Sequence, residues 1–103
     1  MAHGCELETS VLLSLRGDLV QMDKAERDIP VQRSEHFYWD LQSPSRLFFQ
    51  EFFSRYSRTG TSGDPTKAAV EKGRRFVEAV TAKLAGLIRE LRAREIQPRV
   101  DNH

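Results

Sequence analysis

The sequence predicts a mostly α-helical chain with at most one or two short strands. Apolar residues recur at three- and four-residue steps in two segments, one near the amino terminus and one over residues 64–94. Only "HFYWDL" (residues 36–41) has the aromatic composition of a strand. Because so few elements make an awkward independent core, we expect the 103 residues to form a single partial domain.

Residues 1–17 are predicted to carry a polar motif and a short buried helix. The motif is "HGCELETS" (residues 3–10). Apolar side chains recur every four residues from Leu7 to Leu15, with other apolar residues beside them, so the apolar surface covers much of the helix. We expect Gly17 to end this helix in the left-handed conformation that glycine adopts readily.

Residues 18–63 are predicted to be irregular and rich in aromatic residues. Pro30 interrupts regular structure in a polar stretch. "HFYWDL" is either a short strand or an anchored loop, and "RLFFQEFFSRY" (residues 46–56) forms either a helix face or a bulky amphipathic loop. The four phenylalanines of the latter need a cover. "SRTGTSGDP" (residues 57–65) has the composition of a loop.

Residues 64–94 are predicted to form one uninterrupted amphipathic helix, followed by a frayed tail over residues 95–103. Asp64 can accept hydrogen bonds from the first turn, and Pro65 suits the first helical position. Gly73 lies within the apolar stripe, where a glycine costs roughly 1 kcal/mol relative to alanine, so we expect close backbone packing there. The stripe consists of Ala69, Gly73, Phe76, Val77, Val80, Leu84, Leu87, Ile88 and Leu91.

Composition and charge exclude several classes of protein. A net charge of +1, with acids interspersed among the bases, argues against a nucleic-acid surface. No apolar run is long enough to span a bilayer, and acidic rather than basic residues precede the first one, unlike a signal peptide. The single cysteine, Cys5, excludes an internal disulfide. We therefore expect a cytoplasmic protein with no nucleic-acid or membrane partner.

The motif "HGCELETS" has two interpretations when its residues are considered alone. His3 as a proton donor and Glu8 in the first turns of a helix could face one cavity, with Glu8 stabilised by the helix dipole. The alternative is a solvated helix start. Cys5 has no neighbouring base, which favours packing over nucleophilic catalysis. His36, beside three aromatic residues, could line a pocket, but packing in a core or interface is favoured.

Three stretches in register resemble the creatininase (creatinine amidohydrolase) family. "HGCELETS" resembles that family's His-Ala-Gly-x-x-Glu-Thr-Ser motif. "VLLSLRGDLVQMDKAERD" (residues 11–28) is similar to the apolar helix and Arg-Pro-Asp-Leu-Val segment that follow it. "TGTSGDPTKAAVEKGRRFVEA" (residues 59–79) resembles the family's Gly-Asp-Pro loop and closing helix.

The sequence departs from the family pattern at three positions. Gly4, Cys5 and Gly17 stand where alanine, glycine and proline are common in the family. If the family's glycine lets the backbone approach the substrate, Cys5 would narrow the pocket, so the identity of the substrate stays open.

The resemblance implies an α/β fold, of which this chain would be the carboxy-terminal part of a creatininase-like α/β/α domain. It implies a metal-dependent amidohydrolase that cleaves a C–N amide bond in a small molecule, commonly a cyclic one. Two divalent metals, such as zinc, manganese or iron, would activate a water. It further implies a homo-oligomer, often a hexamer.

Two catalytic residues carry over from the resemblance. His3 matches the motif histidine, which acts on the substrate amide as proton donor or positioning group. Glu8 matches the motif glutamate, a metal ligand or outer-shell carboxylate. The family's Glu-x-His pair has no counterpart, because the histidines are His3, His36 and His103 and none follows that pattern. We therefore expect the chain to lack the metal-binding half and to be inactive alone. The alternative is a non-catalytic helical interaction or structural module.

Overall fold

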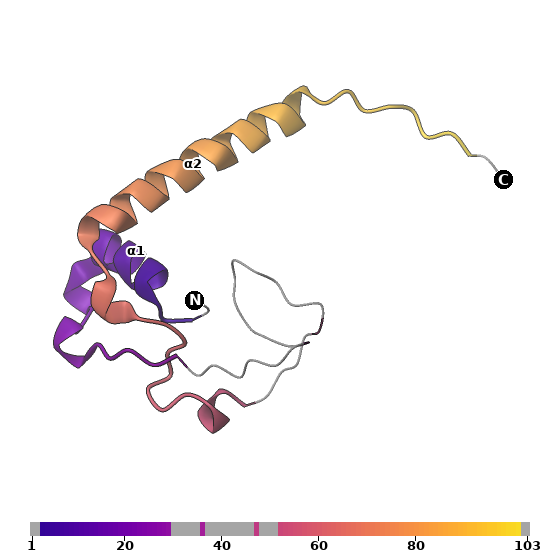
Figure 1. Ribbon diagram of the computed structural model, residues 1–103. Coiled ribbons are helices and arrows are strands. Elements are labelled where there is room, and N and C mark those ends of the chain that lie inside the picture. Colours follow the sequence, from indigo (N-terminus) through magenta and orange to yellow (C-terminus); the bar gives the residue numbers. More distant parts are fainter. Residues whose placement is uncertain (1–2, 30–35, 37–46, 48–51, 102–103) are drawn as a thin grey trace.

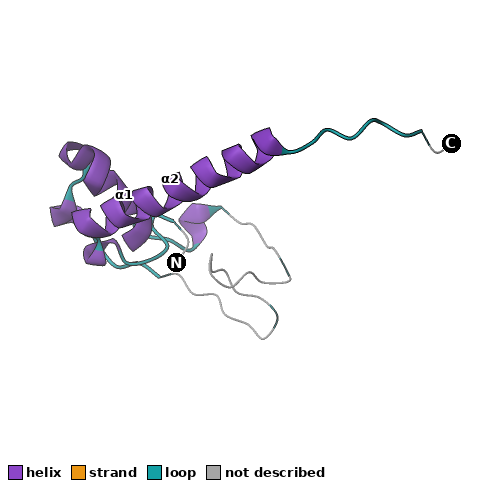
Figure 2. Cartoon of the chain, turned by 90° about the horizontal axis from the view of Figure 1, so that it is seen from above, coloured by secondary structure: helices purple, strands orange, loops and turns teal. Residues whose placement is uncertain are grey.

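The computed structural model describes residues 3–29, 36, 47 and 52–101 (Figure 1). The described part contains two α-helices, α1 (Glu6–Arg16) and α2 (Val70–Ala93), which pack against each other. No strand occurs within these residues, which form only two isolated bridges (Figure 2). The predicted mostly helical fold class is confirmed. Short 3₁₀ turns connect the helices, at Gly17–Leu19, Met22–Lys24, Phe53–Arg55 and Pro65–Lys67.

Helix α1 forms where the apolar periodicity predicts it, but it is not buried as expected. Ser10 is the only buried residue of α1, and Leu12 and Leu15 are exposed. The helix packs on α2 and on the 3₁₀ turn Pro65–Lys67, and these contacts leave part of its apolar surface exposed. Gly17 ends the helix differently from the prediction. Its φ of −58° is right-handed, so the chain continues into a 3₁₀ turn instead of reversing through a left-handed cap.

The long helix is interrupted near its start, so the prediction of one continuous helix from residue 64 is wrong. Asp64 caps only the 3₁₀ turn Pro65–Lys67, accepting a hydrogen bond of 3.2 Å from the Thr66 N–H. Ala69 is extended (φ −148°, ψ 145°), and its N–H donates to Ser10 Oγ at 3.0 Å. This contact with α1 takes the amide out of the helical pattern, and α2 begins at Val70.

The close packing expected at Gly73 is confirmed. A Cβ added to Gly73 would lie 1.9 Å from the Ser10 carbonyl oxygen, so only glycine allows the two helices to approach this closely. Beyond this contact α2 projects away from α1 and continues into an extended tail (Figure 1). The Cα radius of gyration is 19.1 Å, whereas a compact domain of this length has about 13 Å.

Two predicted elements cannot be compared with the structure. Most of "HFYWDL" lies outside the described residues, as do Pro30 and residues 46 and 48–51 of "RLFFQEFFSRY". Phe53–Arg55, at the end of the second stretch, forms a 3₁₀ turn. The loop predicted after it is confirmed, with Gly60 and Gly63 at positive φ.

Candidate functional site

Three segments of the chain meet beside the amino-terminal end of α1. The N–H of His3 donates to the Ser62 carbonyl oxygen at 3.3 Å, and the Ser62 N–H returns a hydrogen bond of 2.6 Å. In the second bridge the Asp28 N–H donates to the Gly63 oxygen at 3.0 Å, and the Gly63 N–H donates to the Asp28 oxygen at 2.7 Å. We call the residues joined in this way, 3–5, 28 and 57–63, the junction.

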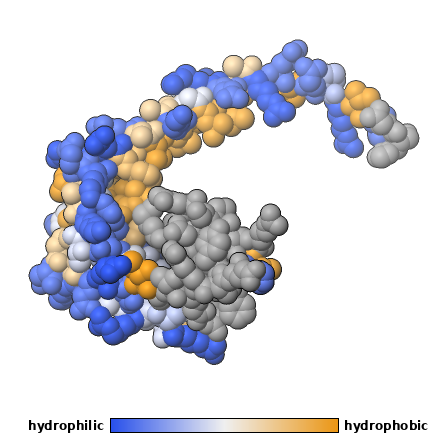
Figure 3. All heavy atoms as spheres, in the orientation of Figure 1, coloured by the Kyte–Doolittle hydropathy of each residue, from blue (hydrophilic) through white to orange (hydrophobic). Residues whose placement is uncertain are grey.

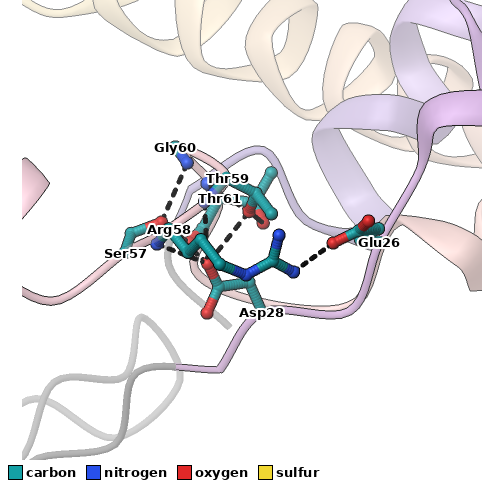
Figure 4. Close-up of polar contacts among 7 residues, drawn as sticks. All are labelled: Glu26, Asp28, Ser57, Arg58, Thr59, Gly60 and Thr61. Atoms are coloured by element: carbon teal, nitrogen blue, oxygen red, sulfur yellow. Dashed lines mark hydrogen bonds and ion pairs between the residues drawn. The ribbon is translucent and has the colours of Figure 1, made fainter.

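The carboxylate of Asp28 organises the loop of the junction (Figure 4). A single oxygen, Oδ2, accepts four hydrogen bonds. Two come from the backbone N–H groups of Arg58 (2.9 Å) and Thr59 (3.0 Å). The other two come from the hydroxyls of Ser57 (3.1 Å) and Thr59 (3.0 Å). Such convergence of donors favours the ionised carboxylate.

The pKa of Asp28 is lowered from its ordinary value by these donors. The N–H of Thr59 contributes most, and the hydroxyls of Thr59 and Ser57 and the N–H of Arg58 add to it, against partial desolvation. Asp28 is therefore a fixed negative charge at neutral pH. Its role here is structural, since it holds the loop in place.

Two further contacts close the loop around this carboxylate. The N–H of Gly60 donates to Ser57 Oγ at 2.9 Å, and the φ of 81° at Gly60 suits a residue without a Cβ. The guanidinium of Arg58 forms an ion pair with the Glu26 carboxylate. Both groups of this pair are largely exposed, so it adds little stability.

Cys5 is enclosed where the loop meets the start of α1. A Cβ added to Gly63 would lie 2.4 Å from the Cys5 Cβ, so the loop fits against Cys5 only because residue 63 is glycine. Gly4 turns the chain at φ 54°, with the Thr61 methyl group 3.0 Å from the place of a Cβ. Cys5 is buried. It packs as a small hydrophobe.

The two predicted catalytic residues lie at the same end of α1, and both are exposed. The His3 ring packs edge-on against Phe53, with ring centroids 5.3 Å apart. The Glu8 side chain makes no hydrogen bond or ion pair within the described part of the chain. Glu6, the first residue of α1, instead forms an ion pair with Lys72 of α2. No hydrogen bond or ion pair joins the His3 and Glu8 side chains, so their joint role stays a prediction.

The described donors do not fit a metal site on their own. No group of three or more histidine, cysteine, aspartate or glutamate side chains in that part of the chain is arranged to hold an ion. Glu8 therefore belongs to no such group among these residues. His36 is exposed, its aromatic neighbours lie outside the described residues, and His103 does as well. The predicted pocket wall around His36 thus remains untested.

Sequence reasoning missed the Asp28 cluster. Asp28 looks like one more charge in a polar stretch, and its partners lie about 30 positions further along the chain. The only usable signal is the loop itself, where Ser57, Thr59 and Thr61 alternate around a glycine. Such hydroxyl-rich loops commonly bind a carboxylate or their own backbone.

Comparisons with known proteins identify a protein family and a crystal structure that are similar to this chain. The family model for creatininase, described as creatinine amidohydrolase, matches residues 1–88. No curated protein matches the chain. A crystal structure from Bacteroides fragilis, of a protein provisionally named a creatinine amidohydrolase, is similar to it with a TM-score of 0.72 and 26% identity.

The similarity is unequal in the two directions. It covers 93% of this chain but only 36% of the Bacteroides fragilis chain, so the present chain spans about a third of that protein's length. No described helix is both long and apolar enough to cross a membrane. Because the family model extends over most of the sequence, including the junction, α1 and most of α2, the chain belongs to the creatininase family.

Proposed function

We propose that this chain supplies one wall of an amidohydrolase site that hydrolyses a C–N amide bond, commonly a cyclic one. The family match over residues 1–88 carries the proposal, because it includes the motif that contains His3 and Glu8. The chain spans 36% of the related structure, so the activity is proposed for a larger assembly. In that assembly, the metal-binding half comes from residues outside this chain.

His3 is proposed as the group that protonates or positions the substrate amide. Its backbone is fixed by the bridge to Ser62, its ring rests on Phe53, and the side chain is exposed. Histidine is the usual proton donor at neutral pH, and the departing nitrogen of an amide needs a proton. A side chain held this way loses less orientational freedom when the substrate binds.

Glu8 is proposed as a ligand or outer-shell carboxylate of a divalent ion, such as zinc, manganese or iron. Its carboxylate is exposed on the first half of α1 and has no partner within the described residues. The described donors alone form no ion site, so we derive no step through a metal here. The proposal for Glu8 depends on ligands from elsewhere.

Complementation tests this function. The chain is coexpressed with a creatininase-family domain truncated to remove its own equivalent of residues 1–103, and creatinine hydrolysis is measured with added zinc, manganese or iron. We expect activity from the pair, none from this chain alone, and a loss of about 100-fold or more with His3→Ala or Glu8→Gln. Glu6→Gln is the matched control, because Glu6 lies on the same helix but its carboxylate forms an ion pair with Lys72.

Two results would count against this proposal. Equal activity of the complemented pair with and without His3 and Glu8 would remove both residues from the site. A pair that copurifies as a folded complex and turns over no amide would favour the second candidate function, a non-catalytic helical module. The observation favouring that second candidate is the exposed apolar face of α2.

The setting of this function follows from the same residues. We infer a cytoplasmic homo-oligomer that acts on a small-molecule amide, without nucleic-acid or membrane partners. The single cysteine and the net charge of +1 support this inference. The family resemblance supports the hexamer, and fractionation with a size measurement on native extracts tests both points.

A further inference from the structure

His3 lies outside the helix that carries the other proposed site residue, Glu8. Helix α1 begins at Glu6, and Gly4 turns the chain before it at φ 54°, in the left-handed region. Helical geometry therefore sets the place of Glu8 but not that of His3. Two groups that act on one substrate need a fixed relative position, so another contact must hold His3.

The loop of the junction holds the backbone of His3. Ser62 forms both hydrogen bonds of the bridge with His3, one as donor and one as acceptor. The next residue, Gly63, leaves no room for a Cβ beside Cys5. The chain around His3 is therefore fixed by residues 57–63 and not by α1.

The ring of His3 is held by the segment that leads into the same loop. Its centroid lies 5.3 Å from that of the Phe53 ring, with an angle of 77° between the planes. Such edge-to-face packing is a favourable arrangement of aromatic rings. The carbonyl oxygen of Phe53 accepts the Ser57 N–H at 3.0 Å, which joins it to the loop. Residues 53–63 thus contact both the backbone and the ring of His3.

Asp28 fastens this loop at both of its ends. Its carboxylate oxygen Oδ2 accepts four hydrogen bonds from residues 57–59. Its backbone forms both hydrogen bonds of the bridge with Gly63. Hydrogen bonds onto an ionised acceptor are about twice as strong as neutral ones. One residue therefore holds the two ends of the segment that holds His3.

Apolar packing does not take over this task. Within the described residues no leucine, isoleucine, valine or phenylalanine side chain is buried. Figure 3 shows large apolar side chains exposed along the inner side of α2 instead. The position of the loop depends on its hydrogen bonds, and the Asp28 carboxylate accepts four of them on one atom.

We propose that Asp28 is a positioning residue for His3, which acts through residues 53–63 to hold the imidazole ring at a fixed place relative to Glu8. The inference rests on the proposed function, in which His3 protonates or positions the substrate amide. Asp28 itself does not touch the substrate. Its removal still affects turnover, because a displacement of about 1 Å in a catalytic group can cost about 100-fold in rate.

Nuclear magnetic resonance of the full chain reports the position of the His3 ring without any turnover. Packing against Phe53 shifts the imidazole proton resonances, and His3→Ala identifies them among the three histidines. We expect Asp28→Ala to lose most of this shift, while helicity by circular dichroism stays that of the wild-type chain. Asp28→Asn keeps an acceptor oxygen for the same donors, so it should retain more of the shift.

Glu26→Ala is the matched control. Glu26 lies two positions before Asp28 and contacts the same loop, through a largely exposed ion pair with Arg58. Such a pair adds little stability, so the His3 shift should stay that of the wild-type chain. Thr59→Val removes one hydroxyl donor and leaves Oδ2 with the other three. It should cause a smaller loss in the same direction, and it decides the matter if Asp28→Ala loses helicity.

Turnover by the complemented pair is the second measurement. Asp28→Ala should lower kcat by about tenfold and leave KM nearly unchanged, because a displaced proton donor slows the chemical step without removing a binding contact. If Asp28 acts through His3, the double variant His3→Ala/Asp28→Ala should be no slower than His3→Ala alone. A merely structural role would lower the activity further in that background.

Three results would overturn the proposal. An unchanged His3 shift in Asp28→Ala would show that the carboxylate does not hold the ring. Equal losses in Asp28→Ala and Asp28→Asn, or in Asp28→Ala and Glu26→Ala, would show that the acceptor on Asp28 is not what matters. A further decrease of kcat in the His3→Ala background would show that Asp28 acts on the rest of the fold. A pair without turnover contradicts the proposed function instead, and the His3 shift still decides whether Asp28 positions the ring.

Discussion

Gly73 of α2 lies so close to α1 that a Cβ on it would come within 1.9 Å of the carbonyl oxygen of Ser10. The same Ser10 accepts the Ala69 N–H through its hydroxyl, at 3.0 Å. One residue of α1 therefore determines both where α2 begins and how closely it approaches. The crossing is held by backbone proximity and one buried hydroxyl, and not by a large apolar core.

Gly73→Ala is expected to destabilise the chain. The added methyl group cannot fit against backbone atoms, so the helices must separate, at a cost of about 1–3 kcal/mol in the free energy of unfolding. Urea unfolding followed by circular dichroism measures it. Gly86→Ala is the matched control, because nothing lies within 4 Å of its added Cβ. There the same change should stabilise the helix by about 1 kcal/mol. Equal effects at the two positions would contradict the close crossing.

Ser10→Ala tests the hydroxyl at the same crossing. Ser10 is buried, and its loss leaves the Ala69 N–H without its acceptor. We expect the free energy of unfolding to fall by about 1–3 kcal/mol. Ser14→Ala serves as the comparison, since Ser14 Oγ donates only to the Val11 oxygen within α1. A Ser14 variant that is as destabilised as the Ser10 variant would show that the Ala69 contact does not matter.

The helices were predictable from the sequence because amphipathic periodicity is a local signal. Gly73 could be identified as a packing site for the same reason, since a glycine in an apolar stripe has a known cost. The interruption at Ala69 was not predictable. Asp64 and Pro65 give a strong local helix start, but the hydrogen bond from Ala69 to Ser10 joins positions 59 apart in the sequence, so it overrides that signal from outside the segment.

The candidate site was predictable only where a family motif carries it. His3 and Glu8 stand out because the motif repeats a known pattern, whereas Asp28 has no local feature that marks it. Its partners are hydroxyls and backbone amides in a distant loop. Nearly every residue has a backbone N–H, so the residue types do not show which amides donate to Asp28. The exposure of α1 was also missed, because periodicity shows that a face is apolar and not what covers it.

Cys5 should react slowly with thiol reagents in the native chain. Its side chain is buried against Gly63, and the sequence contains no other cysteine, so the reaction reports on this site alone. We expect modification by an aromatic disulfide reagent to accelerate about 100-fold or more in urea, since the thiol must become exposed first. A Gly63→Ala variant should lose much of the native protection. Fast modification of the native wild-type chain would show that Cys5 is accessible.

Asp28→Ala is expected to release the loop of the junction while leaving both helices formed. The four donors on Oδ2 lose their acceptor, and the bridge that holds His3 to Ser62 loses its support from the loop. Amide hydrogen exchange measures this as faster exchange at Ser62 and Thr59, without a change in α2. Asp18→Ala is the control, because Asp18 binds only its neighbour Arg16. Unchanged amide exchange at Ser62 in the Asp28 variant would show that the Asp28 carboxylate does not support the bridge between His3 and Ser62.

The free energy of unfolding should depend on pH because the pKa values of Asp28 and Asp64 are lowered in the folded chain. The N–H of Thr59 lowers the pKa of Asp28, and the Thr66 hydroxyl lowers the pKa of Asp64, in both cases below the ordinary value of 3.8. A carboxylate with a lowered folded pKa binds fewer protons in the native state than in the unfolded one. Its contribution is therefore complete above about pH 4 and is lost as the pH falls through the folded pKa.

Urea midpoints measured between about pH 6 and about pH 3 should show this loss only at the acidic end. In Asp28→Asn the side chain no longer titrates, so the acid-side decline should be shallower than in the wild-type chain. Asp64→Asn should act in the same direction and independently, because Asp64 serves the turn before α2 and not the loop around Asp28. A wild-type slope in both variants would mean that other groups govern acid unfolding, and that the hydrogen bonds onto Asp28 do not favour its ionised form.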